Sequence, residues 1–358
     1  MKPYLYAHRP VEFYRKFPKV ELHRHLEGSI RLGTLLEIGK AHGMSLPGTG
    51  RLRELVQVGE EDRYTFENFL SKFQTLRMFY RSPEVIERIT RETVIDAATD
   101  NIRYLELRFT PLALSRAEGF PLSDVMDWVA EAALSAALER NIKVRLIASV
   151  NRQEGPQVAY EVARLAAERI ERGIVGLDLA GNEAELSGMT FVGVFKEARQ
   201  SGLHIAIHAG EWGGPDNVAD AILYLGADRI GHGVRVLEDP RVTVLARDRN
   251  IPFEVCVTSN YQSGVIQALT VHPLPRMISL GLNATINTDD PSISQITLSD
   301  EYHTAVQDLG LSLATLRERI LAAARAAFLP EDEKLSLIAA LDQELTTIMV
   351  SDATSGGG

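Results

Sequence analysis

The sequence predicts an α/β protein, a (β/α)8 TIM barrel with additional helices. Along its 358 residues, short apolar runs alternate with longer stretches of helical spacing, which is typical of parallel strands joined by helices. Eight of the runs are expected to be strands, the number that closes such a barrel. Polar residues follow several runs directly, at the place where barrels of this kind hold their active sites.

The expected strands are short and rich in apolar and β-branched residues. The first lies within residues 20–28. The others cover residues 103–109, 144–150, 174–180, 203–208, 229–231, 253–257 and 283–287. A helical stretch follows most of these runs, so the chain is expected to alternate between strand and helix around the barrel.

Helical spacing of apolar residues predicts the connecting helices. We expect Gly48-Thr49-Gly50 to form a turn, and Ser123 or Asp124 to cap a long helix that ends at Arg140. The other helices are expected at residues 31–42, 64–80, 83–99, 155–172, 191–201, 215–225, 240–249 and 273–280. Two terminal helices, at residues 311–328 and 330–349, are expected to cover the barrel.

The chain is expected to form one domain over residues 1–350, followed by a flexible tail at residues 351–358. No internal repeat, low-complexity tract or linker marks a second domain. Barrels of this type often exceed about 250 residues as a single unit, so the length does not require a division.

Composition restricts the partners. The chain has 48 acidic and 38 basic residues and a net charge of −10, which opposes binding to nucleic acid or to an anionic membrane surface. No apolar run approaches the roughly 18 residues of a membrane span, and Met1–Lys19 lacks the apolar core of a signal peptide. A single cysteine, Cys256, excludes an intrachain disulfide and suits a cytoplasmic protein. A small, nearly neutral substrate is expected.

Two histidines suggest a metal site. His23 and His25 lie one residue apart on an expected strand, so their side chains share a face with alpha carbons about 7 Å apart. Both imidazoles can then reach one metal ion at about 2.0–2.1 Å. Further polar residues follow later strands: His208, Glu211, His232, Asp289 and Asp290. Three imidazoles and one carboxylate suit zinc, and the remaining groups are candidates for acid, base and substrate recognition.

Two local arguments refine this set. Asp289 and Asp290 are adjacent, and neighbouring residues of an extended chain face opposite ways, so the two carboxylates are expected to have different roles. His204 is four residues before His208 and therefore about 13 Å away along a strand. The two histidines cannot bind one ion, and His204 is expected to be structural.

Five motifs carry a resemblance to a known family. They are His23–Ser29, Asp178–Gly181, His208–Glu211, Gly231–Gly233 and Asn287–Pro291. In this order, and spanning about three quarters of the chain, they resemble the successive motifs of the adenosine deaminase family. Together they are far more specific than any one of them.

The resemblance implies one zinc per chain, held by His23, His25, His208 and Asp289. Such a zinc would lower the pKa of a bound water toward neutrality and so generate hydroxide. Glu211 would donate a proton to the purine ring nitrogen beside carbon 6, which requires a raised pKa in a closed pocket.

Other residues receive roles from the same resemblance. His232 would orient the water and take its proton or stabilise the developing charge. Glu27 would face the ribose hydroxyls, Asp290 the purine edge, and the backbone of Gly181 the ring. A phenylalanine-rich helix would close the pocket with Phe66, Phe69 and Phe73.

The implied reaction is hydrolytic deamination of adenosine and 2′-deoxyadenosine to inosine products and ammonia, as in purine salvage. Three residues depart from the family pattern: Glu27 where aspartate is common, Asn182 where an acidic residue is frequent, and Trp212 after Glu211. Three alternatives therefore remain: an adenine deaminase acting on the free base, a deaminase of a 5′-modified adenosine, and an inactive purine-binding module.

Missing motifs exclude other metal sites. One cysteine cannot supply the Pro-Cys-x-x-Cys element of cytidine-deaminase zinc sites. The expected strand at residues 174–180 contains no lysine to bridge two metals, so one metal is expected. No His-Glu-x-x-His motif occurs.

Overall fold

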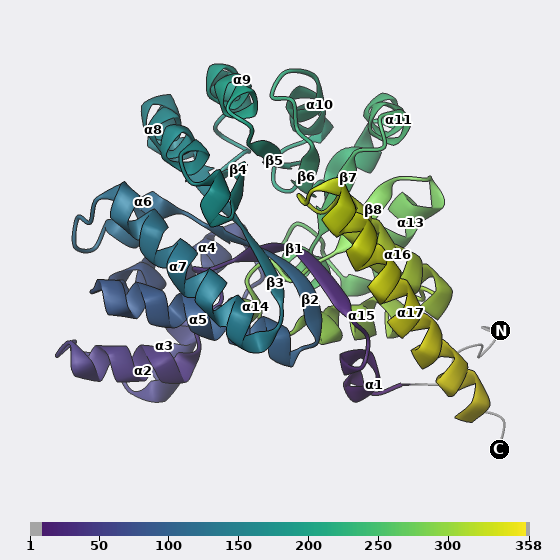
Figure 1. The fold of residues 1–358 in the computed structure, drawn as a ribbon, viewed down its shortest axis with the longest axis horizontal. Coiled ribbons are helices and arrows are strands. Elements are labelled where there is room, and N and C mark those ends of the chain that lie inside the picture. The colour runs from purple at the N-terminus through teal and green to yellow at the C-terminus, as the bar shows by residue number, and fades with distance from the viewer. Residues whose placement is uncertain (1–8, 356–358) are drawn as a thin grey trace.

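The computed structural model describes residues 9–355 and confirms the predicted barrel (Figure 1). Its eight strands follow the order of the chain, and each is parallel to the next. The strands are β1 (Lys19–His25), β2 (Ile102–Phe109), β3 (Lys143–Asn151), β4 (Ile174–Ala180), β5 (His204–Ala209), β6 (Arg229–His232), β7 (Pro252–Val255) and β8 (Asn283–Ile286). Residues 1–8 of the amino-terminal stretch and residues 356–358 of the expected tail lie outside the described residues.

The barrel closes between β1 and the chain just after β8. The Leu22 N–H donates to Asn287 Oδ1 at 2.8 Å, although the two residues are 265 positions apart. The Asp289 N–H donates to the His23 carbonyl at 2.9 Å, and the Asp289 carbonyl accepts from the His25 N–H at 2.8 Å. This seam therefore places Asp289 directly beside the two histidines of β1.

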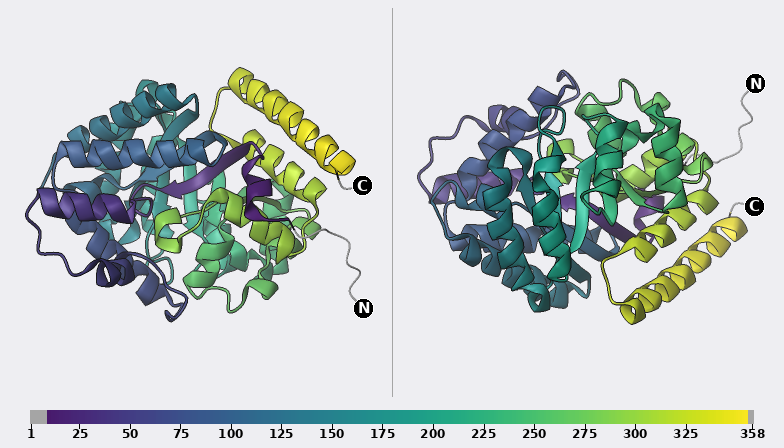
Figure 2. Two further views of the ribbon diagram at one scale, coloured as in Figure 1. Left: turned by 90° about the horizontal axis from the view of Figure 1, so that it is seen from below. Right: turned by 90° about the horizontal axis from the view of Figure 1, so that it is seen from above.

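Helices surround the strands in all three views (Figure 1, Figure 2). The helices that connect strands or cover them are α2 (Leu32–Ala41), α3 (Thr49–Val56), α4 (Phe66–Leu76), α5 (Pro83–Thr99), α7 (Leu122–Arg140), α8 (Gly155–Ala167), α9 (Val192–Gln200), α10 (Pro215–Leu223), α11 (Pro240–Asp248), α13 (Leu274–Ser279), α16 (Leu313–Ala326) and α17 (Glu331–Ser355). Shorter or unexpected helices are α1 (Val11–Arg15), α6 (Pro111–Ser115), α12 (Val257–Gln262), α14 (Pro291–Ser294) and α15 (Leu298–Gln307). A short 3-10 helix, η1 (Arg77–Phe79), continues α4.

Two predictions about helix starts are wrong. Gly48-Thr49-Gly50 is not a turn, because α3 begins at Thr49 and buries Leu52 and Val56. Neither Ser123 nor Asp124 caps α7, which begins at Leu122 after Pro121 without a side-chain cap. The start of α3 is explained by burial of its apolar face. The start of α7 is explained by Pro121, whose fixed backbone angle suits the entry to a helix.

Two predicted ends are also wrong. The strand expected at residues 253–257 ends at Val255, and α12 starts at Val257. The carboxylate of Glu301 accepts from the N–H groups of Val257 and Thr258, each at 2.9 Å, and so caps α12 from a distant helix. The last helix, α17, continues to Ser355, so residues 351–355 of the expected tail are helical.

The two terminal helices cover the seam of the barrel. α16 packs against β1 and β8, and α17 lies along α16 at one edge of the molecule (Figure 1). The chain after α16 closes the amino-terminal end of the barrel, where the Phe328 N–H donates to Glu106 Oε1 at 2.6 Å. The Phe328 ring stacks on His204 with centroids 4.3 Å apart, so His204 has a structural contact at this end, as expected.

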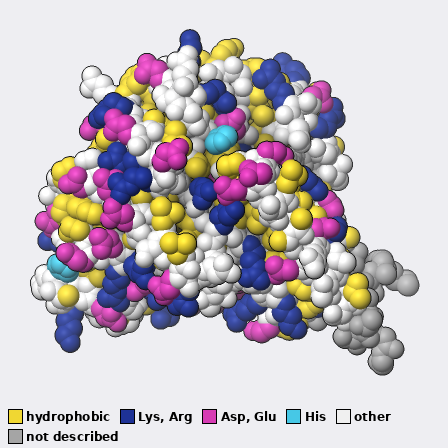
Figure 3. Space-filling view, viewed as in Figure 1, with side chains coloured by type: hydrophobic (Ala, Val, Ile, Leu, Met, Phe, Trp, Pro, Cys, Tyr) yellow, Lys and Arg dark blue, Asp and Glu magenta, His cyan; other side chains and the backbone are white. Residues whose placement is uncertain are grey.

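The described residues include no helix that is both long and apolar enough to cross a membrane. On the face shown in Figure 3, basic and acidic side chains are interspersed rather than gathered into large patches of one sign.

Candidate active site

Five polar side chains converge at the carboxyl end of the barrel. They come from β1 (His23, His25), β5 (His208), β6 (His232) and the seam after β8 (Asp289). Ligand atoms of four of them, all but His25, lie within 4.8 Å of one another. The Nε2 atom of His25 is nevertheless only 3.3 Å from the Nε2 atoms of both His23 and His208. The structure therefore brings together every metal ligand that the sequence suggested.

The spacing fits a single zinc ion. Ligand atoms at about 2.0–2.1 Å from a tetrahedral zinc lie about 3.3 Å from one another. Asp289 Oδ1 is 3.2 Å from His23 Nε2 and 3.4 Å from His25 Nε2, close to that value. His232 Nε2 is farther away, 3.9 Å from Asp289 Oδ2, and lies 3.6 Å from Glu211 Oε2. Three imidazoles and one carboxylate thus match the donor set of zinc, with His232 beside them.

Buried carboxylates fix the orientation of two of the histidines. His23 Nδ1 lies 2.9 Å from Glu254 Oε2, and His208 Nδ1 lies 2.9 Å from Asp178 Oδ1. An imidazole that donates from Nδ1 presents its Nε2 lone pair to a metal. Burial alone would raise the pKa of Asp178, but the neighbouring His208 and Arg108 lower it, so this carboxylate is ionised at neutral pH.

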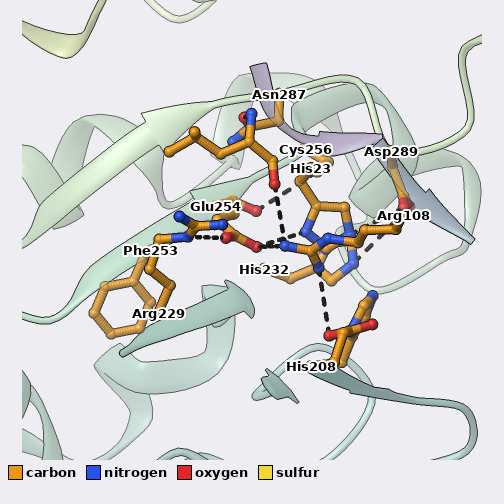
Figure 4. Close-up of polar contacts among 12 residues, drawn as sticks. His23, Arg108, His208, Arg229, His232, Phe253, Glu254, Cys256, Asn287 and Asp289 are labelled. Carbon is orange, nitrogen blue, oxygen red and sulfur yellow. Dashed lines mark hydrogen bonds and ion pairs between the residues drawn. The ribbon is translucent and has the colours of Figure 1, made fainter. Parts of the chain in front are cut away.

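These carboxylates belong to a connected set of buried charged groups inside the barrel, of which Figure 4 labels Glu254, Arg108 and Arg229. Arg229 Nε donates to Glu254 Oε1 at 2.5 Å, and its Nη2 donates to Glu106. Arg108 donates to Glu254 and lies 3.5 Å from Asp178. This set of charged groups therefore extends from the amino-terminal end of the barrel to His23 and His208. Each buried charge in it has an opposite charge beside it.

We expect Asp178→Asn to weaken metal binding by about 10–100-fold, the usual effect of losing a group that orients a metal-binding histidine. The amide keeps the size of the side chain but cannot offer the same negative charge to His208. Titration of the metal-free protein with zinc in the presence of a competing chelator measures the change. A variant with unchanged zinc affinity would show that Asp178 does not orient His208.

Glu211 lies in the same buried site. Burial, with the charges of Asp289 and Glu183 added, raises its pKa well above the ordinary value. The backbone around it is held by Glu183, whose carboxylate accepts from the N–H groups of Gly210 at 2.9 Å, Glu211 at 2.6 Å and Trp212 at 2.8 Å. The raised pKa favours the protonated form that a general acid requires, and Glu183 holds the backbone that carries the side chain.

The sequence argument expected the adjacent aspartates to face opposite ways, and this prediction is wrong. Asp289 has a φ of +67°, so the chain is not extended there, and both side chains line the same cavity. Their environments still differ. Burial would raise the pKa of Asp289, but His232 and His23 lower it well below its usual range. Burial together with Asp289 and Glu27 raises the pKa of Asp290. The pKa of one carboxyl group is therefore lowered and that of its neighbour is raised.

His232 also has a left-handed backbone, with a φ of +58°. Such angles are uncommon outside glycine and often occur at functional sites. Its Nδ1 atom lies 3.1 Å from the Asn260 amide, which holds the ring in place. Burial lowers the pKa of His232 well below its ordinary value.

A cavity of about 350 Å³ opens beside these groups. The predicted pocket residues all line it: Glu27, Phe66, Phe69, Phe73, Gly181 and Asp290. Gly181 has a φ of +89°, and a Cβ there would come 2.4 Å from Gln153 Oε1, so a larger residue would not fit. Trp212, one of the departures from the family pattern, packs edge-on against Phe66 with centroids 4.1 Å apart.

The carboxylate of Glu27 is only half satisfied. Its Oε1 accepts from the Thr110 N–H at 2.6 Å, whereas Oε2 is buried without a hydrogen-bond partner. Burial raises the pKa of Glu27 to about 6. An unpartnered buried oxygen next to a cavity favours a ligand that brings a hydroxyl group to it.

Sequence reasoning missed the groups that hold the site in place. Glu254, Arg108 and Arg229 are charged residues inside apolar strands, and that pattern was the available signal. Asn260 lies on the unexpected helix α12, together with Ser259, whose hydroxyl donates to Asp289 Oδ2 at 2.7 Å. No local signal in the sequence indicated their contribution.

Comparison with known proteins gives a consistent picture. The family model described as adenosine deaminase matches residues 18–344. An adenosine deaminase of Erwinia tasmaniensis is 38% identical over 329 residues, which cover 91% of this chain and 98% of the relative.

Three solved structures share the fold. A zinc-bound amidohydrolase of Burkholderia ambifaria has a TM-score of 0.88 and 25% identity, covering 98% of this chain and 97% of that one. The adenine deaminase of Arthrobacter aurescens has a TM-score of 0.84 and 26% identity, covering 92% and 98%. The N6-mAMP deaminase of Arabidopsis has a TM-score of 0.83 and 30% identity, covering 93% and 99%.

Proposed function

Because the chain belongs to the adenosine deaminase family, we propose that it deaminates adenosine and 2′-deoxyadenosine to inosine and 2′-deoxyinosine, with release of ammonia. The protein is a zinc-dependent hydrolase, and its substrates are water and a small purine. One observation carries the proposal. A donor set with the spacing of a single zinc lies beside a buried carboxyl group of raised pKa, in a cavity of about 350 Å³.

The zinc ligands in this proposal are His23, His25, His208 and Asp289, with one ion per chain. Zinc supplies a Lewis acid that makes water acidic enough to react near neutral pH. Asp178 and Glu254 keep the Nε2 atoms of His208 and His23 turned toward the ion. Ser259 holds one oxygen of Asp289 in the same way.

Glu211 donates its proton to the ring nitrogen next to carbon 6, which makes that carbon electrophilic enough for water to attack. His232 orients the attacking water and holds the proton that it gives up at Nε2, 3.6 Å from the Glu211 carboxyl group. A bond forms from carbon 6 to the water oxygen. The proton held by His232 then passes to the amino nitrogen, whose bond to carbon 6 breaks, and the remaining proton of the added hydroxyl returns to Glu211 as the carbonyl forms. Ammonia leaves, and no redox partner is needed.

The other cavity residues bind the substrate. Protonated Asp290 donates to the purine edge, and the N–H of Gly181 faces the ring. The unpartnered oxygen of Glu27 accepts from a ribose hydroxyl. Phe66, Phe69 and Phe73 of α4 cover the purine and exclude bulk water.

We expect kcat/KM for adenosine and 2′-deoxyadenosine to exceed that for adenine by at least about 10²-fold. A site with a buried carboxylate that needs a hydroxyl partner discriminates against a ligand that lacks one by up to about 10⁴–10⁵-fold. The assay follows the loss of aminopurine absorbance at matched enzyme concentrations. Glu27→Asp serves as the paired variant, and it is expected to keep most nucleoside activity because aspartate is common in the family at this position.

The same assay separates the alternatives. Faster turnover of adenine would make the protein an adenine deaminase with a pocket closed to ribose. Activity on 5′-substituted nucleosides alone would show that the sugar end is open. Absence of ammonia release from every aminopurine, in a zinc-loaded protein, would leave only an inactive purine-binding module.

A further inference from the structure

One guanidinium lies in the wall of the substrate cavity, that of Arg77 in η1. The residue is half-buried, and its Nε is buried without a hydrogen-bond partner. Among the described residues, no ion pair or hydrogen bond to this side chain is found, although its charge acts on the nearby carboxylate of Glu27. A guanidinium carries five N–H donors, so Arg77 has unused donors next to the place where the substrate binds.

Arg77 lies on the side of the cavity where Glu27 stands. Its element, η1, packs against α2, the helix that follows Glu27 in the chain. The short helix α6 lies on this side as well. Thr110, whose N–H donates to Glu27 Oε1, is the residue before α6, and Arg116 is the residue after it. In the proposed function Glu27 meets the ribose, so Arg77 stands at the sugar end of the cavity.

A second cavity, of about 620 Å³, lies on the other side of Arg77. Arg77, Arg81 and Arg116 all line it, and no acidic side chain does. Arg81 is paired with Glu118 at 3.1 Å, whereas Arg116 is exposed and has no ion pair among the described residues. In a chain with a net charge of −10, this second cavity is locally basic, and Arg77 is the residue that it shares with the substrate cavity.

We propose that Arg77 binds an anionic 5′ substituent, and that the protein also deaminates the 5′-phosphate monoester of adenosine. This activity rests on the proposed function, because the same groups act on the same purine. Water adds its oxygen to carbon 6, the bond to the amino nitrogen breaks, ammonia leaves, and the phosphate is unchanged. A planar guanidinium suits this role, since two parallel N–H groups match two phosphate oxygens.

The test compares adenosine with its 5′-monophosphate in the full-length, zinc-loaded protein, by ammonia release and loss of absorbance. Wild type is expected to turn over both compounds. Arg77→Gln is expected to lower kcat/KM for the monophosphate about 10–100-fold more than for adenosine, the effect of losing charged hydrogen bonds. For Arg77→Lys, kcat/KM for the monophosphate should lie between the values for wild type and Arg77→Gln. Arg53→Gln is the matched control, because Arg53 is exposed on α3 and lines neither cavity.

The possible outcomes are distinct. Equal losses for both substrates in Arg77→Gln and in Arg77→Lys, or the same selective loss in Arg53→Gln, would overturn the role of Arg77. Turnover of adenosine but not of the monophosphate by wild type would overturn this inference and leave the proposed function standing. Ammonia from neither compound would overturn both. Zinc content shows whether each variant has kept its fold.

Discussion

We expect His208→Ala to lose its zinc and, with it, essentially all deaminase activity. In the proposed site the imidazole supplies one of the four donor atoms, and its Nε2 lies 3.3 Å from that of His25. Its removal also leaves the buried charge of Asp178 without its histidine partner, which adds a penalty to the lost bond. Metal analysis of the purified protein should find about one zinc per chain in wild type and almost none in the variant.

His204→Ala is the matched control for this experiment. His204 lies on the same strand, β5, but at its far end, where it stacks on Phe328. This variant should keep its zinc even if its stability falls. Two tightly bound metals per chain that are both needed for activity, or a His208→Ala protein that retains zinc and activity, would contradict the proposed site.

We expect Glu211→Gln to keep its zinc while kcat falls by about 10²–10⁴-fold, the usual contribution of a general acid. The amide has the size of the carboxyl group but has no acidic proton to give to the ring nitrogen. The backbone bonds from residues 210–212 to Glu183 do not depend on the side chain at position 211, so the loop should remain in place. Steady-state kinetics and zinc content, measured on one preparation, separate lost proton donation from lost metal.

Glu185→Gln provides the comparison. Glu185 is an exposed carboxylate at the rim of the same cavity, and its loss should change kcat little. A Glu211→Gln enzyme that is nearly fully active would exclude Glu211 as the acid.

Much of the fold is predictable because its signals are local. The eight strands are short apolar runs between helical stretches, and both periodicities are visible without knowledge of the tertiary structure. The errors occur where a contact with a residue far away in the sequence determines where a helix begins. α12 begins at Val257 because Glu301, 44 residues away, accepts its first N–H groups. α3 begins inside a glycine-containing segment because Leu52 and Val56 are buried against the rest of the protein.

In the candidate site too, some residues could be predicted from local signals, whereas contacts between distant residues could not. His23, His25, His208 and Asp289 could be found because each lies in the last residues of a strand or shortly after one, and parallel strands bring these ends to one place. The pairing of Glu254 with His23 depends on the register of strands far apart in the chain, which the sequence does not reveal. The backbone twist at Asp289, which turns two adjacent carboxylates into one cavity, was equally hidden.

The seam between β1 and Asp289 has a consequence for biosynthesis. His23 and Asp289 stand near opposite ends of the chain, and they meet only when the last strand has joined the first. Closure of so long a loop is entropically costly, so this contact is expected to form late in folding. A nascent chain therefore cannot form the complete proposed metal site until Asp289 and the last strand have left the ribosome. Zinc that binds only the closed barrel then stabilises the junction between the first and last strands, so the ion links the two ends of the chain as well as serving the reaction.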